Sequence, residues 1–385
     1  MSDLEKLIEK FCPLGVEYKK IEDISIRICS GGTPKSGNNF YYNGEIFWLR
    51  TQELNFNNIT QTELKITNEG LKNSSAKLIP KNCVIVAMYG ATVGKVGINK
   101  VPLATNQACC NIEVDSRQVL YKYIFYYFCN RYKYIKSLGR GSQNNINIKI
   151  IRNLEVPVPP IEVQNEIVRI LDNFTELTEE LNLNLEKELE ARKKQYEYYR
   201  DLLLTFGSEV ERVELNKICK LERGSIITKN SIVEGKFPVV AGGKKPAYYC
   251  NKFNREGNII TVSSSGANAG YVSYWIEPIF VSDAFSINGI DDIILTKYIY
   301  YYLKSIQNKI YLMKKGGGVP HVKISDIKNF KIPLPPLHEQ QRIVDILDRF
   351  DALCNDITKG LPAEIEARKK QYEYYRDLLL NFKSL

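Results

Sequence analysis

Two polar loops carry the side chains best suited to recognising a ligand. Gly139–Asn145 holds a guanidinium and several side-chain amides, and Lys314–Gly318 puts two lysines at the matching place of the second half of the chain. Arginine pairs with guanine, and Asn or Gln with adenine, through hydrogen bonds in the major groove of DNA. We therefore expect these loops to bind nucleic acid. The candidate residues are Arg140, Ser142, Gln143, Asn144, Lys314, Lys315 and His321.

Other loops and strand ends hold smaller polar or basic sets. For any single residue, an ordinary exposed loop is an equally good interpretation. Nucleic acid is favoured because both halves of the chain place such loops in matching positions, and because side chains of this kind reach phosphates. The further candidates are Lys35, Ser36, Arg50, Lys95, Lys244, Lys245, Ser264 and Asn268.

Patterns that would support catalysis are incomplete. The stretch Gly90–Lys95 is one residue short of a phosphate-binding loop, and Val96 stands where a Ser or Thr must reach magnesium, so a turn between strands is favoured. The Pro159-Pro160 and Pro335-Pro336 pairs lack the polar neighbour found in adenine methyltransferases, and no Gly-rich loop for a methyl donor is present. Acidic pairs such as Asp291-Asp292 lack the basic partner of a nuclease site. We expect no catalytic residue, no metal site and no cofactor.

The bulk composition sets broad limits on the class of protein. The 385 residues suffice for two domains, and the net charge of +9 suits a partner that carries phosphates. No apolar run approaches the length of a membrane-spanning helix, so we expect no membrane span. The nine cysteines are scattered without a C-x-x-C motif, which indicates a reducing, cytoplasmic setting and argues against zinc ribbons and disulfides.

An internal repeat organises the elements that must position these loops. Glu190–Leu204, EARKKQYEYYRDLLL, returns letter for letter at Glu366–Leu380. Pro157–Ile161 answers Pro333–Leu337 in the same register. The chain therefore holds two copies of one plan, a variable block followed by a shared helical block.

Each variable block reads as short strands between turns, followed by a Tyr-rich helix, at Leu120–Leu138 in the first block and Lys297–Leu312 in the second. The pattern predicts an α+β protein in which two similar domains are separated and joined by long antiparallel coiled-coil helices, with a pseudo-two-fold internal repeat. The expected segments are 1–14 (an N-terminal helix that completes the repeat), 15–155 (first domain), 156–209 (first helical spacer), 210–331 (second domain) and 332–385 (second helical spacer).

Apolar residues recur every three to four positions in the first helical block and predict a seam with another helix. Gly360-Leu361-Pro362 should break the second block into two helices, with the repeat in the later one. Whether the first block is broken as well stays open. The expected seam residues are Ile167, Ile170, Phe174, Leu177, Leu181, Leu185, Tyr199 and Phe206.

Three tyrosines, Tyr196, Tyr198 and Tyr199, fall within one turn of the repeated helix and cannot all face one seam. Some of them must meet another surface, so we interpret the repeated helix as both half of a helix pair and a docking site for a partner. The expected partner-binding residues are Tyr196, Tyr199, Tyr372 and Tyr375.

Several short motifs together are typical of one family. They are Pro335–Ile343, the looser Pro159–Gln164, Gly360–Arg368 running into Gln371–Arg376, Gly32-Thr33-Pro34 and Ser75–Pro80. With them, nearly the whole chain resembles the specificity subunit (HsdS) of a Type I restriction-modification system. The departures are Val163, where the family usually has Glu, and the missing Gly-Leu-Pro break in the first helical block.

The resemblance implies a subunit without catalytic activity. Each variable block would be a target-recognition domain that reads one half of a split site in double-stranded DNA, and the helices would set the spacing. The implied partners are two methyltransferase (modification) subunits, which dock on the helices and domains, and restriction subunits; catalysis belongs to them.

Two alternatives from other classes remain. A self-sufficient DNA methyltransferase or nuclease would modify or cut DNA as the purified chain alone. A coiled-coil scaffold without a DNA role would show no preference among DNA sequences, and would leave unexplained why the blocks diverge while the helices repeat.

Overall fold

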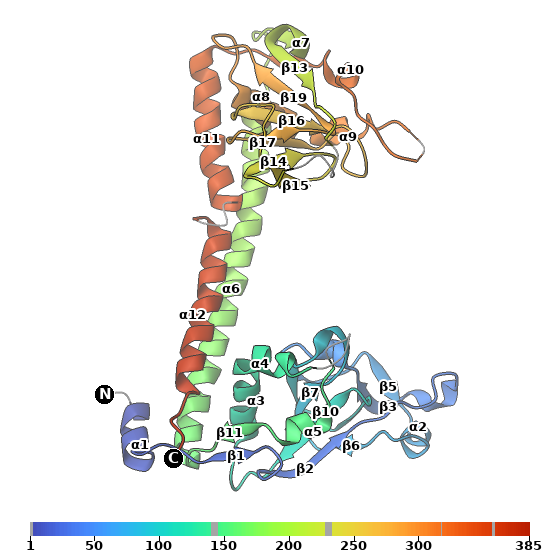
Figure 1. Ribbon diagram of the computed structural model, residues 1–385, viewed down its shortest axis with the longest axis vertical. Coiled ribbons are helices and arrows are strands. Elements are labelled where there is room, and N and C mark those ends of the chain that lie inside the picture. Colours follow the sequence, from blue (N-terminus) through green and yellow to red (C-terminus); the bar gives the residue numbers. More distant parts are fainter. Residues whose placement is uncertain (1–2, 140–144, 228–232, 317, 356–358) are drawn as a thin grey trace. The chain divides into compact units, whose positions relative to one another are not determined.

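The computed structural model describes residues 3–139, 145–227, 233–316, 318–355 and 359–385. The chain divides into two compact units, Met1–Asn182 with Ala367–Leu385, and Leu183–Glu366. Each unit contains one α+β domain and parts of the long helices (Figure 1). This division cuts through both predicted helical spacers, because the two halves of each spacer pack in different units; the five predicted segments themselves stay a prediction.

The first unit begins with a helix and continues with an α+β domain that we call the first domain. Its elements are α1 (Asp3–Phe11), β1 (Tyr18–Lys20), β2 (Ser25–Ser30), η1 (Asn39–Tyr41), β3 (Tyr42–Leu49), η2 (Thr51–Glu53), β4 (Asn57–Ile59), β5 (Leu64–Ile66), α2 (Asn68–Lys72), β6 (Leu78–Ile79), β7 (Val84–Ala87), η3 (Gly90–Thr92), β8 (Val96–Asn99), β9 (Leu103–Thr105), β10 (Cys109–Val114), α3 (Tyr121–Asn130), α4 (Tyr132–Ser137), α5 (Ile148–Arg152) and β11 (Glu155–Pro157).

The second unit holds the second domain. Its elements are β12 (Arg212–Glu214), α7 (Leu215–Ile218), β13 (Cys219–Arg223), β14 (Phe237–Val240), β15 (Tyr248–Cys250), β16 (Ile259–Ser263), β17 (Val272–Trp275), β18 (Phe280–Val281), β19 (Ala284–Gly289), α8 (Thr296–Ser305), α9 (Gln307–Tyr311), α10 (Ile324–Ile327) and β20 (Lys331–Pro333).

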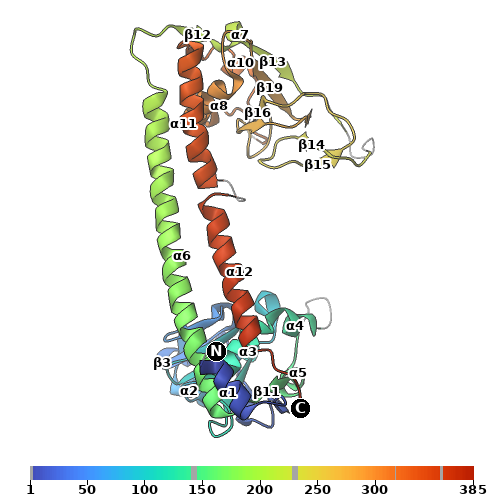
Figure 2. The same ribbon diagram turned by 90° about the vertical axis from the view of Figure 1, so that its left-hand side faces the viewer.

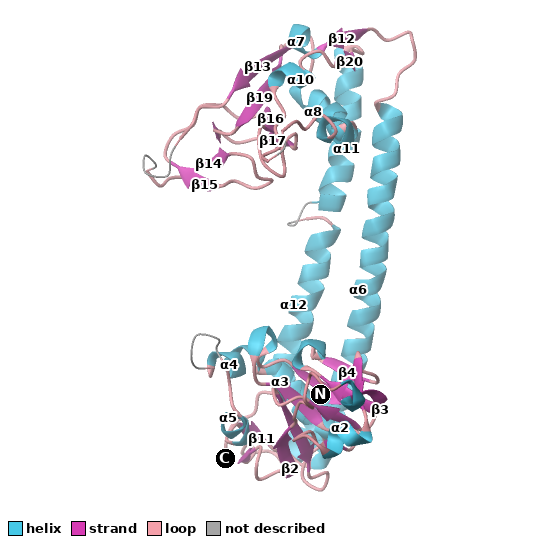
Figure 3. Ribbon diagram, turned by 90° about the vertical axis from the view of Figure 1, so that its right-hand side faces the viewer, coloured by secondary structure: helices cyan, strands magenta, loops and turns pink. Residues whose placement is uncertain are grey.

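The sheets of the two domains follow the same order. The first domain pairs β2-β10-β7-β8, extended by β4, and the second pairs β13-β19-β16-β17. A further sheet holds β5-β3-β9-β6 in the first domain and β15-β14-β18 in the second, and in both it contains one parallel pair. Figure 3 shows the strands of each domain beside its helices. The shared architecture expected from the sequence is confirmed. The single Tyr-rich helix expected in each domain is instead two consecutive helices, α3 and α4 in the first domain and α8 and α9 in the second.

The helical blocks differ in continuity. α6 (Ile161–Leu203) is one helix of 43 residues, whereas the second block forms α11 (Leu337–Asn355) and α12 (Leu361–Leu379). The predicted break at Gly360-Leu361-Pro362 is therefore confirmed, and the first block has none. In the first unit α12 runs antiparallel to the start of α6, with the Tyr372 hydroxyl 2.9 Å from Thr175 Oγ1 and the rings of Phe174 and Tyr375 5.7 Å apart.

The predicted seam is wrong at two positions, Leu177 and Leu181, which are 64% and 38% exposed. Phe174 and Tyr199 are 37% and 39% exposed as well, but their rings pack against Tyr375 and Phe350. The neighbouring Thr175, Thr178 and Asn182 are less exposed instead. Thr175 faces α12, where its hydroxyl forms a hydrogen bond with the Tyr372 hydroxyl. This part of the helix pair is therefore polar.

α1 packs against the start of α6, where Leu4 and Cys12 share an apolar core with Val163 and Ile167 (Figure 2). We expected residues 1–14 to complete the repeat. The C-terminal tail meets the start of the first domain: the Val16 amide donates to the Lys383 carbonyl at 2.9 Å, and Tyr18 donates its hydroxyl to the Phe382 carbonyl at 2.9 Å.

Candidate nucleic-acid interface

A tight turn between β7 and β8 forms the centre of the candidate site in the first domain. Gly90 and Gly94 adopt φ of 79° and 81°, a region that glycine enters without steric cost. The Gly94 amide donates to the Ala87 carbonyl at 2.9 Å and closes the turn. The turn predicted here in place of a phosphate-binding loop is confirmed.

The second domain contains the same turn between β16 and β17. Gly266 and Gly270 have φ of 81° and 82°, and the Gly270 amide donates to the Ser263 carbonyl at 2.7 Å. Each of these glycines follows its counterpart at the same sequence distance that separates the two copies of the repeated helix. Sequence reasoning missed this equivalence, although the pattern Gly-Ala-x-x-Gly occurs in both stretches.

The predicted recognition loop of each domain ends against this turn. The Ile146 amide donates to the Met88 carbonyl at 3.0 Å, and the equivalent Val322 amide donates to the Ser264 carbonyl at 3.0 Å. Gly90 donates to Asn145 Oδ1 at 3.2 Å, and Gly266 to the Pro320 carbonyl at 3.0 Å. We call the two places, 88–95 with 145–146 and 264–270 with 314–316 and 318–322, the turn–loop surfaces. Arg140, Ser142, Gln143 and Asn144 lie outside the described residues.

Five predicted residues come together on the second turn–loop surface. Lys315 and His321 exchange both backbone hydrogen bonds, at 3.0 and 2.8 Å, and so form a small hairpin. Lys314 Nζ donates to the Ala267 carbonyl at 2.8 Å, which fastens the hairpin to the turn. Ser264 and Asn268 belong to the turn itself.

One cation of this surface is partly neutralised. Lys315 Nζ lies 2.7 Å from Asp326 Oδ1, and this contact, with the Lys323 amide, lowers the pKa of the Asp326 carboxyl. On the first turn–loop surface Lys95 Nζ donates to Asn55 Oδ1 at 2.8 Å, so its charge has no carboxylate partner in that contact.

Lys244 extends the second surface through an aromatic ring. Its Nζ lies 5.4 Å from the centroid of Tyr271, the residue directly after the turn, and Lys304 Nζ lies 4.7 Å from the same centroid. Burial and the nearby Arg200 and Lys244 charges lower the pKa of Lys304. Lys304 was not predicted, because it lies in a Tyr-rich helix that the sequence marks as core. Lys245 is exposed beside Lys244.

Lys35 and Ser36 occupy a separate exposed turn, closed by the Asn38 amide donating to the Lys35 carbonyl at 3.1 Å. Among the described residues, no backbone hydrogen bond joins this turn to the first turn–loop surface.

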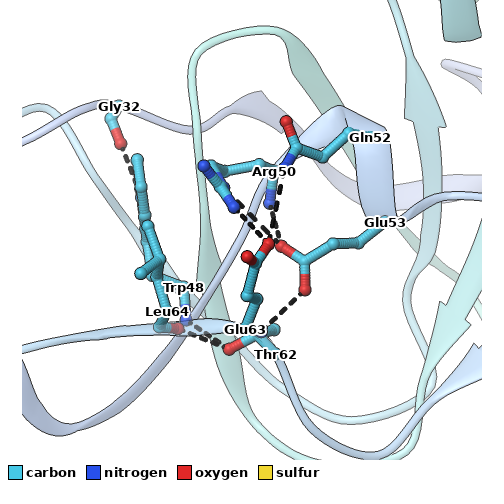
Figure 4. A network of polar contacts seen from close by, with 8 residues as sticks. All are labelled: Gly32, Trp48, Arg50, Gln52, Glu53, Thr62, Glu63 and Leu64. Atoms are coloured by element: carbon cyan, nitrogen blue, oxygen red, sulfur yellow. Dashed lines mark hydrogen bonds and ion pairs between the residues drawn. The ribbon is translucent and has the colours of Figure 1, made fainter.

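Arg50, also predicted to bind nucleic acid, is held in an ion-pair network. Its guanidinium pairs with Glu63 and lies within 3.9 Å of Glu53, and its amide donates to Glu53 Oε1 at 3.1 Å (Figure 4). Two carboxylates against one guanidinium leave the cluster negative, which disfavours a phosphate contact. The network instead holds the segment after β3 against the start of β5.

The tyrosines proposed for docking divide into two classes. Tyr196 and Tyr372 face the helix pairs, and burial raises the pKa of Tyr196 to about 12. Tyr199 and Tyr375 are 39% and 40% exposed and lie against the rings of Phe350 and Phe174.

The most exposed apolar members of the repeated helix were not among the predicted partner-binding residues. In the second unit Tyr198 is 65% and Leu202 is 55% exposed, and in the first unit the equivalent Tyr374 is 64% and Leu378 is 60% exposed. Their signal was the run of three tyrosines in one turn. We call Tyr198, Tyr199 and Leu202, and likewise Tyr374, Tyr375 and Leu378, the tyrosine–leucine patches.

Within the described residues there is no cluster of three His, Cys, Asp or Glu side chains arranged to hold a metal, and no helix with the length and apolarity of a membrane span. All nine cysteines are free thiols.

Comparison with known proteins decides the family. The family model for the type I restriction modification DNA specificity domain matches the chain twice, at residues 13–191 and 207–367. The chain belongs to this family. It is a specificity subunit with two target-recognition domains, and specificity subunits are not the catalytic components of their systems. The first alternative from the sequence, a self-sufficient methyltransferase or nuclease, and the second, a scaffold without a DNA role, are thereby set aside.

The similarity extends over most of the chain. The specificity subunit of EcoR124I/EcoR124II from Escherichia coli is 36% identical over 70% of this chain and 72% of its own. A putative type I specificity subunit from Haemophilus influenzae is 34% identical over 70% and 74%. A solved type I restriction-modification structure shares the fold with a TM-score of 0.72, at 16% identity over 96% of this chain and 98% of that one.

Proposed function

We propose that each target-recognition domain of this specificity subunit reads one half of a bipartite site in double-stranded DNA through its turn–loop surface. The observation that carries the proposal is the matching backbone of the two surfaces. The same backbone hydrogen bonds recur at equivalent positions of the two domains, while the side chains that the loops present differ between them. Two surfaces with the same backbone structure and different side chains suit two half-sites of different sequence.

The proposed contacts divide by chemistry. Lys95, Lys244 and Lys314 are assigned to phosphates, since a lysine acts as a point charge. Ser264, Asn268 and His321, with Arg140, Ser142, Gln143 and Asn144 of the first loop, are assigned to base edges. The DNA that flanks each half-site is assigned to Lys35, Ser36, Lys245 and Lys315. Arg50 is left out because its charge is already paired.

The test uses the complete complex and sites in which each half is varied separately. Replacing Asn268 and His321 by Ala in one chain should relax selectivity for one half-site and leave the other unchanged. A Lys187→Ala variant serves as control, because Lys187 is exposed on α6 and belongs to neither turn–loop surface. Relaxation of both half-sites, or of neither, would count against the assignment.

We propose further that the two tyrosine–leucine patches dock two copies of the modification subunit, and that restriction subunits join this assembly. The patches come from the identical stretches Glu190–Leu204 and Glu366–Leu380, and their exposure agrees residue by residue. Exposed rings and leucines grouped in this way mark protein contacts. Two equal patches suit two copies of one partner. The complex would work in the cytoplasm, where free thiols are stable.

The stoichiometry of the complex tests the docking proposal. Tyr198→Ala with Leu202→Ala should reduce the number of bound modification subunits from two to one, measured by light scattering after gel filtration. The same changes at Tyr374 and Leu378 should remove the other copy, and all four should remove both. Two bound modification subunits in the fourfold variant would contradict it.

A further inference from the structure

In each unit, one fully buried glutamine fastens the α+β domain to the helix that follows it. Gln164 Oε1 accepts the Leu120 amide at 2.9 Å, and its Nε2 donates to the carbonyls of Gln118 and Pro159 at 3.0 and 2.7 Å. Its counterpart Gln340 makes the same three bonds. It accepts from the Leu295 amide at 2.8 Å and donates to the carbonyls of Ile293 and Pro335 at 3.2 and 2.8 Å.

A charged triad repeats the connection about two turns further along the helix. Lys122 Nζ lies 2.5 Å from one carboxylate oxygen of Asp172, and the Tyr126 hydroxyl donates to the other at 2.8 Å. In the second unit, Lys297 Nζ lies 2.7 Å from Asp348, and the Tyr301 hydroxyl donates to the other oxygen of that carboxylate.

Two more hydroxyls of the Tyr-rich helix tie it to the strand before the spacer helix. Tyr123 donates to the Pro157 carbonyl at 3.0 Å, and Tyr298 to the Pro333 carbonyl at 3.1 Å. Both rings are fully buried. The Tyr-rich helix thus holds the strand, the Pro-Pro segment and the spacer helix together. We call the set Gln164, Lys122, Tyr123, Tyr126 and Asp172, with its counterpart Gln340, Lys297, Tyr298, Tyr301 and Asp348, the clamp.

The clamp consists of polar side chains, although apolar packing alone would hold the domain and its spacer helix together. In each unit, the apolar core already runs from the domain sheet into the spacer helix, through Val163 and Ile167 or Ile343 and Leu347. Apolar contacts depend little on direction, whereas buried hydrogen bonds are satisfied in one geometry and costly when unmade. The clamp therefore adds orientation to a contact that the core already stabilises.

We propose that the clamp sets the orientation of each target-recognition domain on its spacer helix, and so sets the spacer length that the subunit accepts between the two half-sites. The inference rests on the proposed bipartite reading. Its residues contact neither the turn–loop surfaces nor the tyrosine–leucine patches in the described hydrogen bonds, so they act as positioning residues. Both domains use the same clamp because both need a fixed angle, whatever sequence each reads.

The test measures methylation by the complete complex on duplexes whose half-sites are constant and whose spacer is one base pair shorter, correct or one longer. Asp348→Asn keeps the size of the side chain and removes the charge that Lys297 and Tyr301 bind. We expect the preference for the correct spacer to fall by about tenfold, the factor that one charge-assisted hydrogen bond supplies. The half-site sequences should stay the same. Tyr301→Phe, which removes one hydroxyl and keeps the ring, should shift the preference in the same direction.

Asp345→Asn is the matched control. Asp345 lies one turn earlier on α11, is exposed, and its described hydrogen bond comes from Gln341 of the same helix. Its replacement should leave the spacer preference unchanged. If wild type prefers one spacer and both Asp348→Asn and Tyr301→Phe keep that preference in full, the clamp proposal is overturned. If wild type shows no dependence on the half-sites at all, the proposed function fails instead.

Discussion

Replacing Gln340 by Met tests how the second domain is fastened to α11. The change keeps the approximate length of the side chain and its helix propensity, but removes three hydrogen bonds in a site with no exposed surface. The partly buried Leu295 amide then loses its described partner, and the carbonyls of Ile293 and Pro335 lose one bond each.

Each lost bond removes about 0.5–1.5 kcal/mol of net stability, and a buried donor left unmade costs about 1–3 kcal/mol. The free energy of unfolding should fall by roughly 2–4 kcal/mol in all. For a unit of this size one kcal/mol shifts the melting temperature by about 2–4 °C, so we expect a loss of about 4–16 °C.

The assay is calorimetry of the full chain, with Gln341→Met as control. Gln341 is the next residue of the same helix, is exposed, and its described side-chain bond goes to Asp345 at 2.6 Å. Its replacement should change the melting temperature by about 2 °C or less, since substitutions near the surface stay within about 0.5 kcal/mol. Equal losses for the two variants would refute the reasoning, because burial of the three bonds would then not matter.

Three further predictions concern the turn, the pH dependence and the helix. Gly270→Ala should destabilise the second domain by about 1 kcal/mol or more in urea unfolding, because φ is +82° and the new Cβ would lie 3.0 Å from Ile310, whereas Gly37→Ala, with open space, should have little effect. Lys315 lowers the pKa of the Asp326 carboxyl in the folded state. The ion pair therefore stabilises the fold above the unfolded pKa of about 3.9, and this stabilisation is lost as the pH falls through the lower folded pKa. Asp326→Asn should make the free energy of unfolding depend less on pH in the acid range, and an unchanged dependence would speak against the ion pair. Inserting one heptad, or two helical turns, into α6 within 181–190 lengthens the helix by about 10 Å and keeps the heptad phase. The spacer of the methylated site should then be longer by roughly three base pairs, with unaltered half-sites. A change in the half-sites would argue against the helix as spacer.

Local patterns predicted the elements of this protein well. The short strands expected between turns are found in both domains, and the turn at Gly90–Lys95 follows from glycines that permit positive φ. The break before Leu361 follows from Gly-Leu-Pro, since proline removes a helical donor and glycine weakens a helix. These features depend on a few neighbouring residues, which is why the sequence reveals them.

Features that depend on a distant partner were not predictable in the same way. Leu177 and Leu181 continue an apolar stripe along α6, yet they are exposed, because α12 presents Tyr372 to the neighbouring Thr175. Arg50 looked free for a phosphate until the fold brought Glu63 to it from the next strand. The equal hydrogen bonds of Gln164 and Gln340 were hidden for the same reason, although the Pro-Pro-x-x-x-Gln spacing pointed to both residues.

The most direct test of the account is methylome sequencing of cells that carry the complete system with one target-recognition domain exchanged. The block 15–155 would be replaced by that of a relative, with the second domain and both helical regions unchanged. The account predicts that one half of the methylated site changes, and that the other half and the spacer length stay as they were. Changes in both halves, or an unchanged site, would contradict it.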